Sequence, residues 1–172
     1  MANEVFQKQG APVIWSSGGA GEELILSNLS VDGTAGGSYY DRGDLSSTPG
    51  PDEYEWEIII GGFNTAPVVG ETVDLYFSQS NDTTEFDGQP TSLPGDSSGP
   101  ASGPTTDMLK NMMYAGSAVV HSTTSTDELI TRGVVRFTSR YFFPVVHNNT
   151  ADILASGDAH ILTLTPIFYQ GQ

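Results

Sequence analysis

Residues 53 to 59 read Glu-Tyr-Glu-Trp-Glu-Ile-Ile, and this alternation of acidic and apolar side chains guides the interpretation of the whole chain. Successive side chains of a strand point to opposite faces, so the glutamates share one face while Tyr54, Trp56 and Ile58 share the other. The pattern predicts a strand with one face in a core. Trp56 is therefore assigned to core packing rather than to ligand stacking.

A second alternation follows a linker that contains Gly61-Gly62 and Pro67. From Thr72 to Ser78, apolar Val73, Leu75 and Phe77 alternate with more polar neighbours. This segment also predicts a half-buried strand, and we expect the two strands to pair as a hairpin.

Further strands are expected on both sides of these two. They are predicted at 13–15, 23–29, 114–121, 128–139, 141–148 and 159–169, where apolar, β-branched and aromatic residues lie between clusters of turn residues. Thr106-Asp107 precedes Met108 to Met113, which predicts one short helix. Seven or eight strands at irregular spacing, with no intervening helices, favour an all-β fold: an antiparallel, jelly-roll-like β-sandwich with one short helix.

The length of 172 residues suits one domain. Residues 1–12 are predicted to form a flexible N-terminal arm, and residues 13–172 the sandwich. A long Gly/Pro/Ser loop is expected at about 80–106, since 15 of the 20 residues from Asp87 to Thr106 are Gly, Pro, Ser or Thr.

Composition excludes several functions. The formal charge of −15 opposes binding to a nucleic-acid backbone. The absence of cysteine removes thiolate chemistry and the usual structural zinc sites, and three scattered histidines do not suggest a metal site. No basic leader or long apolar run is seen, so neither secretion nor membrane association is predicted.

Five residues are candidates for partner binding. Arg132, Arg136 and Arg140 recur at even positions, so an unbroken strand would display them on one face. One interpretation is a solvated or salt-bridged face, opposite the glutamates at 53, 55 and 57. The other is a docking surface for acidic groups of a partner. Lys8 and Phe6 in the predicted arm complete the candidate set.

Other motifs point to binding only weakly. Tyr39 and Tyr40, in a Gly-rich loop, are candidates for stacking on a sugar. Arg42-Gly43-Asp44 spells the tripeptide that integrins bind, which we attribute to chance. The acidic cluster from Asn81 to Asp87 departs from the spacing of a calcium loop, so no metal site is predicted.

No catalytic residues or cofactors are predicted. The chain lacks a nucleophile elbow, a phosphate loop and a dinucleotide fingerprint. A glycoside hydrolase needs only two suitably spaced carboxylates, but the sequence does not select a pair from 21 acidic residues. We therefore expect a protein without enzymatic activity, with glycan cleavage as a remaining alternative.

Four segments together resemble capsid decoration, or cement, proteins of tailed bacteriophages, which are small virion proteins built on a β-sandwich. The segments are Trp15 to Gly19, Pro67 to Tyr76, Leu109 to Val120, and Arg140 to Pro166. The resemblance implies a homotrimer that binds the major capsid protein, stabilises its lattice on the capsid exterior, and is made in the host cytoplasm. The alternative is a carbohydrate- or receptor-binding module of a phage tail or fibre.

Overall fold

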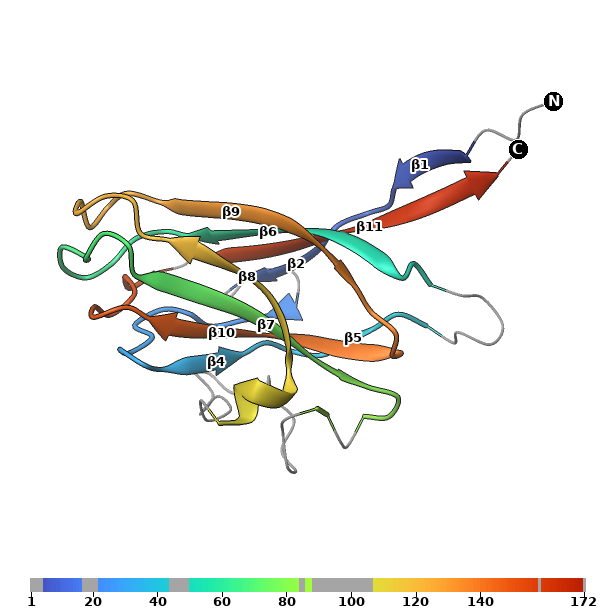
Figure 1. The fold of residues 1–172 in the computed structure, drawn as a ribbon, viewed down its shortest axis with the longest axis horizontal. Coiled ribbons are helices and arrows are strands. Elements are labelled where there is room, and N and C mark those ends of the chain that lie inside the picture. The colour runs from blue at the N-terminus through green and yellow to red at the C-terminus, as the bar shows by residue number, and fades with distance from the viewer. Residues whose placement is uncertain are drawn as a thin grey trace.

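The computed structural model describes residues 5–16, 22–43, 50–83, 86–87, 107–157 and 159–171, and these form two packed β-sheets (Figure 1). The first, called the β6 sheet, has the order β3-β2-β11-β6-β9, with β1 also pairing with β11. The second, called the β7 sheet, has the order β4-β10-β7-β8, with β5 also pairing with β10. The prediction of an all-β sandwich is confirmed.

The elements have these bounds: β1 Val5–Gln9, β2 Val13–Ser16, β3 Glu22–Glu23, β4 Thr34–Gly36, β5 Tyr40–Asp41, β6 Glu53–Ile60, β7 Thr72–Ser80, β8 Met113–Val119, β9 Leu129–Arg136, β10 Tyr141–Asn149 and β11 Ile161–Gly171. A 3-10 helix, η1 (Met108–Asn111), stands where the short helix was predicted. The predicted run at 23–29 is a strand only at its first residue. Beyond it, Leu24, Leu26 and Leu29 are buried in an irregular connection, and Asn28 has a left-handed φ of 58°.

The strand order is that of a jelly roll. The chain passes from β2 to β4 and β5 in the other sheet, returns to β6, crosses to β7 and β8, and then places β9, β10 and β11 alternately in the two sheets. Each sheet is therefore assembled from strands far apart in sequence, all antiparallel except the short β2–β3 pair.

The predicted hairpin between 53–59 and 72–78 is wrong. β6 pairs with β11 and β9, whereas β7 pairs with β10 and β8. The two strands face each other across the core. Each strand has one apolar face, and because the linker crosses from one sheet to the other, both of these apolar faces are buried against each other. Trp56 and Phe77 are 2% and 0% exposed.

Two prolines explain why the edge strands are interrupted. Pro166 in β11 lies opposite the break between β1 and β2, and Pro144 in β10 lies opposite the break between β4 and β5. A proline has no N–H for a ladder bond, so its edge partner cannot continue regularly. At each break a glycine donates its N–H to the proline carbonyl, Gly10 at 2.9 Å and Gly37 at 2.8 Å.

Part of the predicted N-terminal arm is an ordered strand. Residues 5–9 pair with residues 167–171 of β11, while β6 reaches only as far as Ile167. Beyond that residue, β1 and the end of β11 form a two-stranded extension that projects from the sandwich and carries both termini (Figure 1). We call this extension, residues 5–9 and 167–171, the terminal ribbon.

Candidate functional site

The predicted arginine stripe is divided between two places. Arg132 and Arg136 lie on β9 in register with Glu57 and Glu53 of β6, and Arg132 forms an ion pair with Glu57. Arg140 lies beyond the end of β9, in the turn to β10, so it is not part of the same strand face. Its guanidinium binds Asp41 through two bonds of 2.8 Å. Each of the three arginines has an acidic partner, but only Arg132 pairs with a glutamate of the predicted stripe. Docking of a partner on them stays a prediction.

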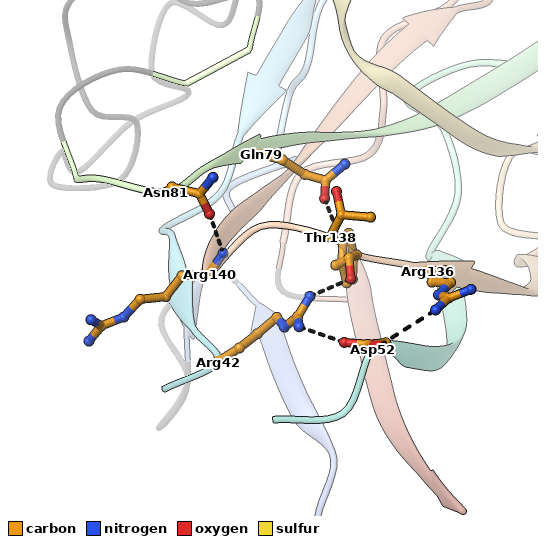
Figure 2. Close-up of polar contacts among 8 residues, drawn as sticks. Arg42, Asp52, Gln79, Asn81, Arg136, Thr138 and Arg140 are labelled. Atoms are coloured by element: carbon orange, nitrogen blue, oxygen red, sulfur yellow. Dashed lines mark hydrogen bonds and ion pairs between the residues drawn. The ribbon is translucent and has the colours of Figure 1, made fainter. Parts of the chain in front are cut away.

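A fourth arginine is buried beside this turn (Figure 2). The side chain of Arg42 has no exposed surface; it donates to the Phe137 carbonyl at 2.5 Å and to Asp52 at 2.9 Å. Arg136 approaches the same Asp52 carboxylate at 3.7 Å. A receptor cannot reach a guanidinium in this position. Arg42 is therefore a structural residue, and Asp44 of the tripeptide lies outside the described residues.

Among the candidate calcium ligands, Asn81 contacts the same turn, and Asp87 is held through its backbone. Asn81 Oδ1 accepts from the backbone N–H of Arg140 at 3.2 Å, and the Asp87 N–H donates to the Gln79 carbonyl at 3.1 Å. The side-chain Oε1 of Gln79 accepts from the backbone N–H of Thr138, as Figure 2 shows. The side-chain contacts of Asn81 and Gln79 bind the β9–β10 turn to the end of β7. Glu85 lies outside the described residues.

The two candidate sugar-stacking tyrosines pack against other rings. Tyr40 contacts Trp15 and Phe142, with ring centroids 6.3 Å and 5.5 Å away. Tyr39 belongs to a second apolar cluster on the outer face of the β7 sheet, which η1 covers (Figure 1). The buried members of that cluster are Phe86, Leu109, Met112, Phe143 and Val145. Both tyrosines are half-buried, so neither ring stands free in solvent.

The arm candidates lie on the terminal ribbon. Lys8 is exposed and pairs with Phe168, and Phe6 occupies the register position opposite Gln170. Phe168 and Tyr169 are 38% and 56% exposed. A cavity of about 470 Å³ lies at the base of the ribbon, between residues 167–169 and the segment from Gly50 to Glu53, with Arg136 on its wall. The ribbon thus presents two exposed aromatic side chains, Phe168 and Tyr169, near the exposed Lys8.

Pairing across the β7 sheet gathers a set of residues that the sequence analysis did not bring together. Thr34, His147, Asp74 and Ser117 follow one another across β4, β10, β7 and β8, and we call them the polar row. Ser117 donates to Asp74 at 2.5 Å. Because this donation uses the only hydroxyl hydrogen of Ser117, the 2.5 Å contact with Tyr114 has the tyrosine as donor.

A bulge places Tyr114 beside the row. Residues three apart in a regular strand point to opposite faces, but the register shift between Leu75 and Tyr76 adds a residue to β8. Tyr114 and Ser117 therefore share the outer face. Nothing in the local sequence marks this shift, so the contact was not predictable.

Asp74 is ionised at neutral pH despite its burial. Desolvation opposes ionisation, but the neighbouring imidazole of His147 and the hydroxyls of Ser117 and Thr72 outweigh it and keep the pKa of Asp74 below its ordinary value. His147 Nδ1 lies 3.9 Å from Asp74 Oδ2.

The polar row borders a cavity and contains an unpaired atom. Asp74 and His147, both 8% exposed, line a cavity of about 430 Å³ together with Tyr76, Tyr114, Asn149, Leu109, Lys110 and Met112. The buried His147 Nε2 has no hydrogen-bond partner. The row is not a nucleophilic triad, because Ser117 binds the aspartate and not the imidazole.

The described residues contain neither a metal-binding cluster nor a membrane-spanning helix, and no family model or curated protein matches the chain. Within the described ranges, no three His, Cys, Asp or Glu side chains are grouped so as to hold a metal ion. No helix among those residues has the length and apolar character to cross a membrane. The chain matches no protein-family model, and the search of curated proteins found no match.

Proposed function

We propose that this protein is a non-enzymatic virion structural protein of a tailed bacteriophage, a decoration protein that binds the major capsid protein on the outside of the capsid. The resemblance given by Trp15 to Gly19 and the other three segments motivates the proposal. The terminal ribbon is the observation that supports it best, because a protein that joins neighbouring subunits needs an extension beyond its own core.

The free edge of β1 suits the addition of a strand from a neighbour. Among the described residues, no strand pairs with β1 on the side away from β11. Gly10 donates toward β11, and the backbone groups of an antiparallel strand alternate between its two sides. The N–H and C=O of Lys8 therefore point to β11, while those of Gln7 and Gln9 point to the open edge. An open edge with free donors is a template for a strand of another chain.

Charge sets a condition on the assembly. Three chains that each carry −15 repel one another, so the proposed homotrimer requires an apolar or ion-paired interface. Lys8 on the ribbon, and Arg132 and Arg136 on β9, are cations that an acidic partner surface would contact.

The test uses purified protein and undecorated capsids of the matching phage, with binding measured by co-sedimentation. Gln7→Pro removes an N–H from the open edge and should weaken binding about tenfold, the effect of one lost hydrogen bond at an interface. Tyr169→Ala should also weaken it. Tyr114→Ala is the matched control, since Tyr114 is likewise 56% exposed but lies on the other sheet.

Two results would contradict the proposal. If the wild-type protein does not associate with capsids but binds a purified tail component, the assignment to the capsid fails. If Tyr114→Ala weakens capsid binding as much as Gln7→Pro and Tyr169→Ala, the ribbon is not the docking element.

A further inference from the structure

The cavity beside the polar row lies on the outer face of the β7 sheet, away from the terminal ribbon. Its floor consists of side chains from β7, β8 and β10, including Asp74, Tyr114 and His147. Leu109 and Lys110 of η1, with Met112, form its opposite wall. Its volume of about 430 Å³ falls within the usual range for small-molecule sites.

The side chains around this cavity leave hydrogen-bonding capacity unused. His147 lines the cavity, is nine-tenths buried, and has no partner at Nε2. Leaving such a polar atom unpaired costs about 1–3 kcal/mol, which a hydroxyl supplied by a ligand would recover. Asn149 is exposed at the cavity wall and donates to Thr72 at 3.3 Å, which leaves its carbonyl oxygen available as an acceptor.

Charge restricts what the cavity holds. Anions are disfavoured by the ionised carboxylate of Asp74 and by the net charge of −15, and Lys110 is already paired with Asp107 at 2.7 Å. A metal ion is disfavoured because Asp74 is the single carboxylate among the lining residues, beside the cationic Lys110. A neutral ligand meets both restrictions.

A hydroxyl group fits the remaining requirements, since it donates and accepts. It can bond to His147 Nε2 in either direction or donate to the Asn149 carbonyl oxygen, while Tyr76, Leu109 and Met112 supply apolar surface for the C–H face of a ring. We propose that this cavity binds a neutral polyhydroxylated ligand, one sugar unit of a glycan. This activity goes beyond capsid decoration, and neither Tyr39 nor Tyr40 is among the residues that line the cavity.

The site binds the sugar without cleaving it. Hydrolysis of a glycosidic bond requires two carboxyl groups on either side of the bond, and the described residues of the lining contain one.

The experiment begins with a glycan array and continues with calorimetric titration of the free sugar that binds best. Asn149→Ala should raise its dissociation constant about tenfold, as should His147→Gln, because each change removes a partner of a sugar hydroxyl. The matched controls are Asn64→Ala and His121→Gln, which change exposed residues outside the cavity lining. Both controls should bind as the wild type does.

A measurement on the wild-type protein guards against misfolded variants. In protein labelled with 15N at histidine, the sugar should shift the Nε2 resonance of His147 and leave that of His160 unchanged. Parallel titrations use inorganic phosphate and calcium chloride.

A blank array, a sugar whose affinity Asn149→Ala does not change, or a His147 resonance that responds to phosphate or calcium but to no sugar would each overturn the proposal. Capsid binding separates the two proposals, because Gln7→Pro should impair it without changing sugar affinity, and Asn149→Ala should do the reverse.

Discussion

Trp56 spans the core between two glycines, one in each sheet. A Cβ atom on Gly133 of β9 would lie 2.7 Å from the indole ring, and one on Gly116 of β8 would lie 2.8 Å from it. Neither distance is tolerated by a close-packed interior, so these positions are glycines to make room for the ring. The sequence predicts that Trp56 is buried but does not show which residues must be small, because that depends on strands 60 and 77 residues away.

Gly133→Ala should therefore lower the free energy of unfolding by about 1–3 kcal/mol, the usual effect of overpacking. This sign is diagnostic, since alanine is otherwise the better strand residue. Urea denaturation measures the change. Val134→Ala, at a neighbouring position that is 60% exposed, should alter stability by less than about 0.5 kcal/mol. Equal stability of the Gly133→Ala variant and the wild type would contradict the predicted contact.

His160 is a buried neutral histidine with both nitrogens engaged. Its Nδ1 accepts from the Gly61 N–H at 3.1 Å, and its Nε2 lies 3.0 Å from the Ala155 carbonyl. Burial lowers the pKa of His160 below 6.5, and the bond to Ala155 offsets part of this effect. Protonation would also place a hydrogen on Nδ1 against the Gly61 donor.

Because the folded pKa of His160 is lower than the unfolded one, the unfolded chain binds more protons between these two values. The stabilisation is complete above pH 6.5 and is lost as the pH falls toward the folded pKa. The melting temperature should therefore decrease from about pH 7.5 to pH 5. His160→Gln should reduce this dependence, and His121→Gln, an exposed control, should preserve it. An unchanged slope in the His160→Gln variant would contradict the prediction.

Arg42 and Arg136 share Asp52 but differ in burial, so they test which arginine stabilises the fold. Arg42→Met removes a buried donor from the Phe137 carbonyl and should cost about 1–3 kcal/mol of unfolding free energy. Arg136→Met, at a side chain that is 71% exposed, should cost less than about 1 kcal/mol. Thermal or urea denaturation of both variants measures the two losses of stability. Similar losses would show that the arginines stabilise the fold through their charge near Asp52 rather than through the buried hydrogen bond of Arg42.

At the scale of elements, periodicity predicts strands well and their partners poorly. Alternation over 53–59 and 72–78 identified two strands and the correct buried face of each. Their pairing was wrong, because an apolar face predicts burial but does not specify which sheet lies opposite. The polar row illustrates the same limit: Asp74, Ser117 and His147 meet through the register of three strands and one bulge, and no local pattern encodes that register.

The alternation of backbone N–H and C=O groups along β1 leads to a separate prediction about the terminal ribbon. Lys8→Pro removes a ladder donor to β11, so the amide protons of Phe168 and Gln170, which point to β1, should exchange at least about tenfold faster. Gln7→Pro removes a donor on the open edge and should leave their protection unchanged. Hydrogen exchange followed by NMR distinguishes the two variants. If Gln7→Pro frays the ribbon as much as Lys8→Pro, the assignment of the open edge is wrong.

At the scale of the molecule, the jelly roll places the two proposed binding regions on different parts of its surface. The terminal ribbon extends the β6 sheet (Figure 1), whereas residues on the outer face of the β7 sheet line the cavity. A jelly roll by itself does not imply a function, since the same architecture serves capsid proteins, lectins and cupins. Because the two regions lie apart, a copy attached through its ribbon would keep the cavity available to a second ligand.

The net charge of −15 makes self-association depend on salt. Repulsion between copies is screened over about 8 Å at physiological ionic strength and over about 30 Å at 0.01 M. If copies meet at the open edge of β1, where Lys8 is the nearby cation, sedimentation velocity should show a monomer at about 0.01 M salt and a growing oligomer fraction toward about 0.5 M. Gln7→Pro should remain monomeric throughout. An oligomer that dissociates as salt increases would instead indicate an interface held by ion pairs. Arg132 and Arg136 of β9 would then be the first residues to replace with glutamine.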